Sequence, residues 1–200
     1  MGTTDRIEIV PYREEWPNQF QQAKHLLATT LQGLHVSIDH IGSTSVPGLR
    51  AKDRIDIQIT VRETFEELKS RIDQRLVASG FPPSRHNEDH RPPHDDCLES
   101  DWRKLYISGV HPELPFRSNI HVRKLSSRNW RYPLLFRDYL REHPQSAEAY
   151  ARVKEKLALY LVDNRDAYTD AKDPVCDLLM VEAEGWAGRT GWLPVLSDGE

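Results

Sequence analysis

The chain has 200 residues, 38% of them hydrophobic and 29% charged, and a formal net charge of −4 at pH 7. This length suits one domain, and the negative net charge argues against a surface coated with basic residues for nucleic-acid binding. The two cysteines, Cys97 and Cys176, are too few and too far apart for a disulfide framework or a cysteine-rich zinc site.

The sequence lacks the features of a membrane or secreted protein. No run of about 18 apolar residues occurs, and residues 1–6 lack the apolar segment that a signal peptide needs. We therefore expect a soluble, cytoplasmic protein without a membrane partner. We expect residues 1–200 to form a single domain, with a sheet core to about residue 125 and C-terminal helices over about residues 126–190.

In the first part of the chain, strand and helix patterns follow one another. Alternating polar and apolar residues predict three strands: Arg6–Val10, His35–Ile41 and Arg54–Val61. Apolar residues at helical spacing predict two helices, from about Asn18 to Leu31 and over Glu63–Ala78. The residues between 81 and 100 include four prolines and follow no sustained period, which predicts a long loop of the kind that often forms a lid.

The second part begins with strands and ends in helices. Two alternating stretches, Trp102–Ile107 and Ser118–Arg123, predict an antiparallel pair. Helical spacing then predicts three helices: Tyr132–Arg141, Ser146–Val162 and about Pro174–Trp186. This order of elements indicates an α+β fold in which helices flank a sheet and form a C-terminal layer.

The loop between the second and third predicted strands contains two glycines, a proline and three hydroxyl residues. A Gly-Ser turn at a strand end can present backbone amides and a hydroxyl to phosphate oxygens. We therefore expect a phosphate site made of Gly42, Ser43, Thr44 and Ser45, to which Lys52 adds a positive charge. A serine-rich turn without a ligand is the alternative.

Asp56 lies on the polar face of the next predicted strand, alternating with the isoleucines. A carboxylate at this place can hold a divalent cation that bridges phosphates. We therefore expect Asp56 to bind Mg²⁺ or Mn²⁺ and to act together with Ser43.

The residues around this loop resemble known proteins. Gly42-Ser43, twelve intervening residues and Asp56-Ile57-x-Ile59 resemble the signature of the nucleotidyltransferase superfamily. The longer string His40–Leu49, with Lys52 and Ile55–Ile57, is similar to the GrpB family. The likeness covers nearly the whole chain and extends to these residues: Tyr12, Trp16, Asp89-His90, Pro92-Pro93, Asn119–Arg123, Leu135–Arg141, Tyr150, Lys154 and Lys172–Pro174. The resemblance implies a nucleotidyltransferase-like mixed sheet flanked by helices, in a family whose members occur alone or fused to dephospho-CoA kinase.

The sequence departs from the pattern that the superfamily resemblance implies. Active nucleotidyltransferases carry a second carboxylate two residues after the first and a third on a later strand, and together these hold two metal ions. Gln58 stands at the second position here, and the later strand offers Asn119 and His121. Three explanations remain open: one metal ion is enough, the loop supplies acids such as Glu88, Asp89 or Asp95, or the site performs different chemistry.

His121 alternates with Ile120 and Val122, so it should share a face with Asp56 if the strands pair as in the resembling family. On that face it can serve as an acid–base group or a ligand near neutral pH; a hydrogen-bonded structural histidine is the alternative. A second group, His86, His90 and His94, is spaced by fours, but Pro92-Pro93 breaks any helix that would gather it into a zinc site.

Seven basic residues and one acid, Asp138, lie between Arg117 and Arg141. This local excess predicts an anion-binding wall in which Arg123 and Arg137 bind phosphate. The alternative is that these arginines pair with acids such as Asp138 or lie on a solvated face. Three interleaved aromatic residues suit either stacking on a base or packing between helices: Trp130, Tyr132 and Tyr139.

Taken together, these features favour a transferase-like enzyme that binds a nucleotide or other phosphorylated ligand, with Ser43, Asp56 and His121 as catalytic residues. Fungal arginine-containing cyclodipeptide synthases resemble GrpB proteins and join aminoacyl groups from charged tRNAs, so an amide-forming enzyme with tRNA as its partner is one alternative. A noncatalytic module that binds phosphate or nucleotide is another, and the missing carboxylates favour it.

Overall fold

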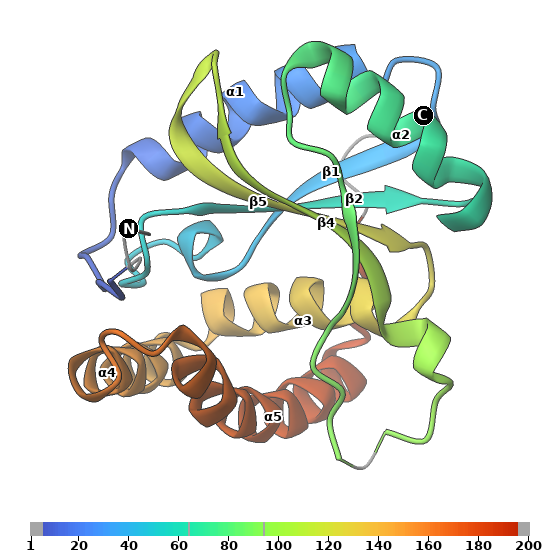
Figure 1. Ribbon diagram of the computed structural model, residues 1–200. Coiled ribbons are helices and arrows are strands. Elements are labelled where there is room, and N and C mark those ends of the chain that lie inside the picture. Colours follow the sequence, from blue (N-terminus) through green and yellow to red (C-terminus); the bar gives the residue numbers. More distant parts are fainter. Residues whose placement is uncertain (1–5, 64, 94, 196–200) are drawn as a thin grey trace.

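A five-stranded mixed sheet runs through the centre of the protein, in a computed structural model that describes residues 6–63, 65–93 and 95–195 (Figure 1). The strands are β1 (Val36–Ile41), β2 (Ile55–Val61), β3 (Arg85–Glu88), β4 (Arg103–His111) and β5 (Leu114–Lys124). Their spatial order is β1-β2-β5-β4-β3. The central pair, β2 and β5, is parallel, and every other neighbouring pair is antiparallel.

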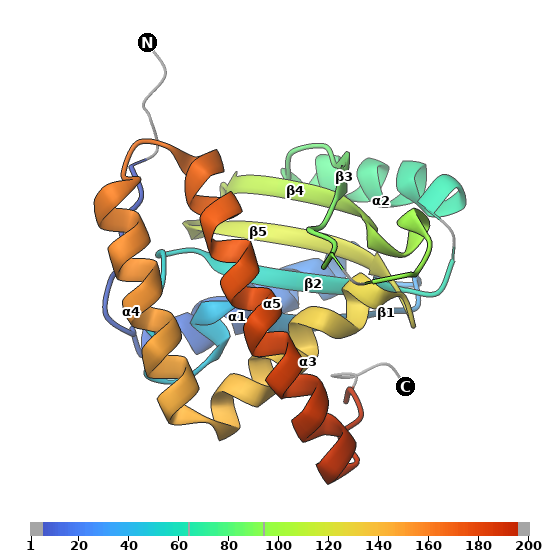
Figure 2. The same ribbon diagram turned by 90° about the horizontal axis from the view of Figure 1, so that it is seen from below.

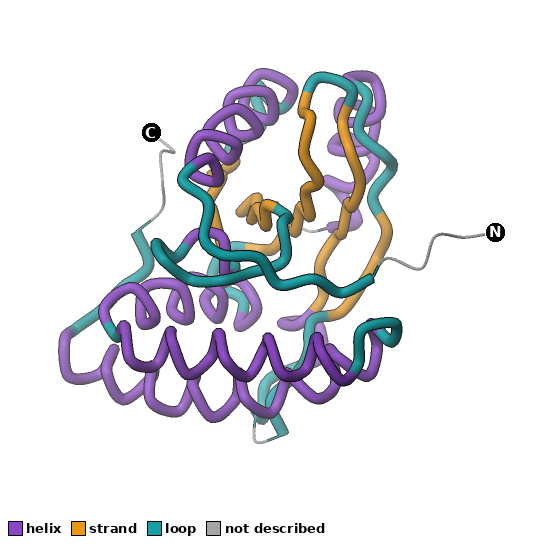
Figure 3. The backbone as a smooth tube through the Cα atoms, turned by 90° about the vertical axis from the view of Figure 1, so that its left-hand side faces the viewer, coloured by secondary structure: helices purple, strands orange, loops and turns teal. Residues whose placement is uncertain are grey.

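Helices cover both faces of the sheet (Figures 1 and 3). Two lie on one face: α1 (Glu15–Thr30) and α2 (Phe65–Ser79). Three lie on the other: α3 (Arg128–Glu142), α4 (Pro144–Tyr160) and α5 (Arg165–Thr190), which lie below the sheet in Figure 1 and in front of it in Figure 2. Two short 3-10 helices, η1 (Ser43–Ser45) and η2 (Glu99–Trp102), lie in the connections. The predicted α+β class, with a mixed sheet, flanking helices and a helical C-terminal layer, is confirmed.

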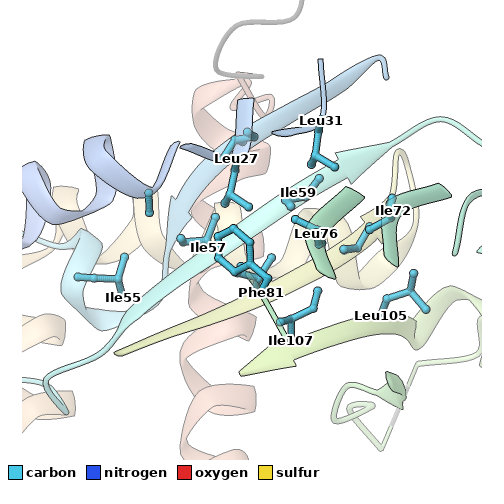
Figure 4. Packing of buried hydrophobic residues seen from close by; sticks show 14 of the residues in the cluster. Leu27, Leu31, Ile55, Ile57, Ile59, Ile72, Leu76, Phe81, Leu105 and Ile107 are labelled. Atoms are coloured by element: carbon cyan, nitrogen blue, oxygen red, sulfur yellow. The ribbon is translucent and has the colours of Figure 1, made fainter. Parts of the chain in front are cut away.

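The strict alternation of β2 divides apolar from polar side chains. Ile55, Ile57 and Ile59 are fully buried in the core against α1 and α2 (Figure 4). Burying each such side chain stabilises the fold by about 1.5–3 kcal/mol. Because successive strand residues point to opposite faces, Asp56 and Gln58 are directed toward the layer formed by α3, α4 and α5.

A second apolar cluster joins the C-terminal helices to the connection between β1 and β2. Val46 and Leu49 from this connection pack with Leu135 of α3, Tyr150 of α4 and Met180 of α5. The turn after β1 is therefore held between the sheet and the helical layer. None of the described helices is long and apolar enough to span a bilayer.

The structure differs from the sequence-based prediction in three places. Residues 6–10 form no strand but a single bridge, between Val10 and Ala51, because they run past the β1–β2 connection and not along the sheet. The expected loop after α2 contains β3, which pairs with β4. Helix α5 begins at Arg165 and not near Pro174, because the side chain of Asn164 caps it by accepting a hydrogen bond from the Ala167 amide at 3.0 Å.

Candidate functional site

Gly42 brings the turn after β1 into contact with Asp56. Its φ is +71°, and a Cβ on this residue would lie 2.5 Å from Oδ2 of Asp56. A side chain is therefore excluded both by the backbone conformation and by the close approach. Thr44 and Ser45 are buried and use their hydroxyls within the turn: Ser45 Oγ donates to the Gly42 carbonyl at 2.6 Å, and Thr44 Oγ1 lies 3.0 Å from Nε2 of His40.

Lys154 of α4 reaches the third hydroxyl of the turn. Its Nζ donates to Ser43 Oγ at 2.8 Å and to the Arg50 carbonyl at 2.6 Å, and the side chain is buried. Burial, and to a lesser extent the positive charges of Lys172 and Arg50, lower the pKa of Lys154 to about 7. Both hydrogen-bond acceptors are uncharged oxygens, so neither supplies the negative charge that would oppose this shift.

The sheet brings Asp56, Asn119 and His121 together because β2 and β5 pair in parallel. Oδ1 of Asp56 accepts a hydrogen bond from Nδ2 of Asn119 at 2.8 Å and lies 4.0 Å from Nε2 of His121. His121 therefore faces Asp56, as its alternation in the sequence predicts.

The two titratable groups of this trio are shifted in the same direction. Burial raises the pKa of Asp56, but His121 and the hydrogen bond from Asn119 lower it more, so the net shift is downward. Burial lowers the pKa of His121 to about 4, assisted by the charges of Arg123 and Lys104. At neutral pH the site therefore holds an ionised carboxylate beside a neutral imidazole.

Both the nitrogen and the oxygen of the Gln58 side-chain amide form hydrogen bonds with the protein. Nε2 donates to the Trp130 carbonyl at 3.1 Å, and Oε1 accepts from Arg123 at 2.8 Å. The guanidinium of Arg123 also pairs with Asp89 at 2.9 Å, and Asp89 forms a second ion pair with Lys104. Burial raises the pKa of Asp89, but the charges of Arg123 and Lys104 lower it well below its usual range. We call Lys104, Arg123 and Asp89 the paired end of the site.

Asp89 belongs to a segment that crosses from the sheet edge to the helical layer, which we call the strap (residues 85–93; green in Figure 1). Nε2 of His90 lies 2.9 Å from Oδ2 of Asp177 on α5. His86 belongs to β3, and His94 lies outside the described residues. The strap therefore supplies an acid to Arg123 and Lys104 and ties the sheet to α5.

A cavity of about 820 Å³ lies between the polar face of the sheet and α3, α4 and α5. The Gly42–Ser43 turn, Asp56 and His121 all line it. Ten lysine and arginine side chains and seven carboxylates line this cavity in the described part of the chain. A local excess of positive charge in a chain of net charge −4 favours an anionic ligand.

Four cations gather at the Ser43 side of this cavity, and we call Lys52, Lys154, Arg165 and Lys172 the cationic end. Of these, Lys172 pairs with Asp173 at 2.7 Å. Nζ of Lys52 lies 3.9 Å from the centroid of the Tyr168 ring. Burial, and to a lesser extent the charges of Arg165, Arg54 and Lys172, lower the pKa of Lys52 to about 8. In the part of the chain that the structure describes, neither Lys52 nor Lys154 forms an ion pair with a carboxylate.

The basic stretch from Arg117 to Arg141 does not form one wall of the cavity. Arg123 lines the cavity, but Arg131 pairs with Glu184. Arg137 pairs with Asp138 at 2.7 Å and donates to the His40 carbonyl at 3.0 Å, so it supports the strand that precedes the turn. The helical rotation of α3 directs these side chains to different neighbours. Among the three aromatic residues of this stretch, Tyr132 lines the cavity, whereas Trp130 and Tyr139 are core residues.

Sequence reasoning assigned no role to Lys154 or Lys172, although both stand in the string that resembles the GrpB family. The sequence does indicate that Lys154 lies on the buried face of its helix, because it stands one helical turn after Tyr150 and one turn before Ala158. A lysine on the buried stripe of an amphipathic helix requires a partner, and here that partner is the turn containing Ser43.

The residues around Asp56 do not fit a divalent-cation centre. One carboxylate oxygen accepts from Asn119 and the other lies against Gly42, while the oxygen of Gln58 accepts from Arg123. The described residues contain no group of three His, Cys, Asp or Glu side chains able to hold a metal ion. Lys104 and Arg123 add positive charge nearby, which disfavours a bound cation. The Mg²⁺ or Mn²⁺ expected at Asp56 would therefore have a single carboxylate ligand, and both oxygens of that carboxylate already contact other groups of the protein.

Comparison with known proteins connects this architecture to relatives. The sequence model of the GrpB protein family matches residues 6–182. The chain is 36% identical to a UPF0157 protein of Pseudomonas aeruginosa over 176 residues, which cover 86% of this chain and 65% of that protein. It is 30% identical to a dephospho-CoA kinase of Mycolicibacterium paratuberculosis over 201 residues, which cover 94% of this chain and 48% of that protein.

A solved structure shares the fold. The crystal structure of the conserved protein GrpB from Enterococcus faecalis superposes with a TM-score of 0.70 at 25% sequence identity, covering 90% of this chain and 99% of that one. The chain spans about two thirds of the length of the first of these two curated relatives and about half of the second.

Proposed function

The chain belongs to the GrpB protein family, and we propose that its cavity binds a nucleotide or other phosphorylated small molecule as the site of a transferase. The observation that carries this proposal is the cationic end, where Lys52 and Lys154 lie beside the Gly42–Ser43 turn without a carboxylate partner in the described residues.

Lys52 and Lys154 both place positive charge in the interior of the protein. An ammonium group that loses water without gaining a counter-ion is unfavourable, and its pKa falls. The pKa values of Lys52 and Lys154 are both lowered, to about 8 and about 7. A phosphate group beside Lys52 would supply a negative charge and accept charge-assisted hydrogen bonds.

The size and lining of the cavity favour a small molecule larger than phosphate itself. Its volume of about 820 Å³ lies within the range of small-molecule sites, roughly 300–1,000 Å³. Tyr132 and Phe136 of α3 line the wall, with their rings 6.3 Å apart and nearly parallel. In the proposed complex the phosphates occupy the cationic end, and an aromatic or sugar portion extends toward these rings.

The opposite wall of the cavity would act on the group that accepts the transferred fragment. Asp56 is fixed by Asn119, and neutral His121 faces it. A neutral imidazole beside a carboxylate can take a proton from an acceptor hydroxyl or amine. We propose Ser43 and Lys52 as phosphate-binding residues and His121, with Asp56, as the acid–base group.

Because lysines surround the proposed phosphate position, we expect binding that does not depend on Mg²⁺. A thermal-shift series with nucleoside triphosphates, dephospho-CoA and pyrophosphate, each with and without Mg²⁺, tests the proposal. Selective binding raises the apparent stability by mass action. We expect at least one phosphorylated compound to stabilise the wild type but not Lys52→Met, while Lys156→Met, an exposed change on α4, matches the wild type.

Two outcomes of that series would contradict the proposal: no phosphorylated compound stabilises the wild type, or one stabilises Lys52→Met equally well. Charged tRNA belongs in the same series, because it tests the amide-forming alternative. Binding of tRNA that weakens steeply with added salt would favour that alternative.

A further inference from the structure

Ser43 and Lys154 have the geometry of a nucleophile and its base. Oγ of Ser43 lies 2.8 Å from Nζ of Lys154, and Lys154 is its one hydrogen-bond partner in the described residues. Thr44 and Ser45 use their hydroxyls inside the turn, so the Ser43 hydroxyl is the one that the turn leaves to the cavity. Serine paired with lysine is an established alternative to serine paired with histidine in nucleophilic catalysis.

We propose that Ser43 is a nucleophile activated by Lys154 and that the site transfers acyl groups from activated esters or thioesters through an acyl-Ser43 intermediate. The inference rests on the proposed function in one respect, namely that the cationic end is a ligand site. It adds the reacting group and the chemical class of the substrate: an acyl compound whose leaving group or carrier bears phosphate.

The hydrogen-bond pattern around Lys154 suits an uncharged amine. Nζ has two partners, Ser43 Oγ and the Arg50 carbonyl at 2.6 Å. The carbonyl can only accept, so it takes one N–H of the amine. The lone pair of the neutral amine is then free to accept the hydroxyl proton of Ser43. A charged ammonium would instead donate to Oγ and would hold the serine in its un-ionised form.

The surroundings of Lys154 favour that neutral form. Burial is the largest cause that lowers its pKa, and Lys172 of α5 and Arg50 of the β1–β2 connection act in the same direction. Cys176 of α5 and Asp56 of β2 oppose them, and the Tyr150 ring lies 4.7 Å from Nζ on the same helix. With a pKa of about 7, a substantial fraction of Lys154 is uncharged at physiological pH.

The proposed reaction balances without a further reagent. Oγ of Ser43 attacks the carbonyl carbon while Nζ of Lys154 takes the hydroxyl proton, and the bond from that carbon to the leaving group then breaks. The leaving group departs with the proton held by Lys154, which leaves an ester on Ser43. A water molecule or an amine attacks this ester, gives its proton to Lys154, and the Ser43 hydroxyl is restored from the same proton.

Acetylation by p-nitrophenyl acetate tests the nucleophile with a simple activated ester. We expect a burst of p-nitrophenolate and an acetyl group on Ser43, located by fragmentation of the tryptic peptide. Ser43→Ala should abolish that adduct. Lys154→Arg keeps the positive charge but cannot accept a proton at neutral pH, so it should slow the burst by about 100-fold or more, whereas Lys156→Met should react as the wild type does.

The pH dependence of the burst rate shows whether Lys154 acts as a base or only holds Ser43 in place. In the wild type, the burst rate should rise as the pH passes through about 7, where Lys154 loses its proton. The inference is overturned if the wild type gives no acetyl-Ser43, or if Lys154→Arg reacts at the wild-type rate. Ser43→Ala removes a single hydroxyl, so it decides the question even if Lys154 variants fail to fold.

Thermal shifts with pyrophosphate on the same variants distinguish this inference from the proposed function. Stabilisation by pyrophosphate without acetylation of Ser43 would contradict the proposal that Ser43 is a nucleophile and would support the phosphate site. Acetylation of Ser43 without stabilisation by any phosphorylated compound would support the nucleophile and contradict the phosphate site.

Discussion

The two ends of the cavity both contain a buried lysine, but the two lysines differ in their partners. Lys104 at the paired end is 6% exposed, and Lys154 at the cationic end is 3% exposed. Asp89 forms an ion pair with Lys104, whereas Lys154 has a hydroxyl and a carbonyl oxygen as partners. Burial alone therefore does not distinguish the two lysines. The difference lies in whether the fold also supplies the counter-ion.

The paired end also gives a role to Gln58, which stands where the sequence resemblance implies an acid. Gln58 accepts a hydrogen bond from Arg123 and donates one to the Trp130 carbonyl, so its amide joins β2, β5 and α3. The acid that the strap provides, Asp89, goes to Arg123 and Lys104. Charge at this end is used to join the strap to the sheet.

Removing the counter-ion of the paired end should have the largest effect. Asp89→Asn leaves the buried Lys104 and Arg123 without their carboxylate, so we expect the free energy of unfolding to fall by about 3–5 kcal/mol. Urea denaturation measures this loss. Asp96→Asn, an exposed change in the same connection, should alter stability by no more than about 0.5 kcal/mol. Equal stabilities of the two variants would show that the paired end is not held by charge.

Adding a side chain at Gly42, where the backbone closely approaches Asp56, should have the next largest effect on stability. Gly42→Ala and Gly48→Ala both place alanine at positive φ, but a Cβ at Gly48 meets nothing within 4 Å, whereas one at Gly42 lies 2.5 Å from Oδ2 of Asp56. We expect Gly42→Ala to be less stable than Gly48→Ala by about 1–3 kcal/mol. Thermal unfolding measures the difference. If the two variants unfold together, the contact with Asp56 does not constrain the turn.

Two variants that each lose one lysine, one at each end of the cavity, change the net charge equally. Their affinities for pyrophosphate therefore compare the two ends directly. Loss of a charge-assisted hydrogen bond costs about 1.5–3 kcal/mol, so Lys52→Met should weaken pyrophosphate binding about tenfold or more. Lys104→Met should leave that affinity near the wild-type value, because Asp89 already neutralises Lys104. Isothermal titration calorimetry measures both dissociation constants. Equal weakening in both variants would mean that total charge, and not the cationic end, attracts the anion.

The smallest expected effect is a change in the pH dependence of stability. The pKa of Lys154 is about 7 in the folded protein and about 10.4 in the unfolded chain. The unfolded state therefore binds more protons between these values, and stability rises with pH across that window.

Between pH 7 and pH 8, Lys154 should contribute a gain of about 1 kcal/mol. Urea unfolding at both pH values should show that Lys154→Met lacks this part of the gain, while Lys156→Met retains it. A gain in Lys154→Met equal to that of the wild type would show that Lys154 is charged in the folded state.

The sequence was sufficient for those parts of the fold and site that depend on periodicity. Alternation placed Asp56 and His121 on the polar faces of their strands, and the parallel pairing of β2 with β5 brings them within 4.0 Å. The glycine at position 42 was recognisable as part of a turn, although its contact with Asp56 was not. The sequence predicts a shorter α5 because a proline is typical of the first turn of a helix, whereas Pro174 lies inside α5.

The pairing of charges could not be predicted, because it depends on contacts between distant parts of the chain. Asp89 reaches Arg123 across 34 residues, and Lys154 reaches Ser43 across 111. Counting charges along residues 117–141 suggested one basic wall, but the rotation of α3 sends Arg131 to Glu184 and Arg137 to Asp138. Local charge in a sequence therefore says little until the partner of each cation is known.

At the cationic end, Lys52 and Lys154 have no carboxylate partner in the described residues. A pH titration of the lysine side chains by NMR tests most directly whether a ligand supplies the anion for Lys52. Signals from the labelled amines would be assigned with Lys52→Arg and Lys154→Arg. We predict that two lysines titrate near pH 7 and pH 8, and that pyrophosphate raises the pKa of Lys52, the one near pH 8, but not that of Lys104. Titration of both near pH 10.4, the unperturbed value, with no response to pyrophosphate would contradict the account.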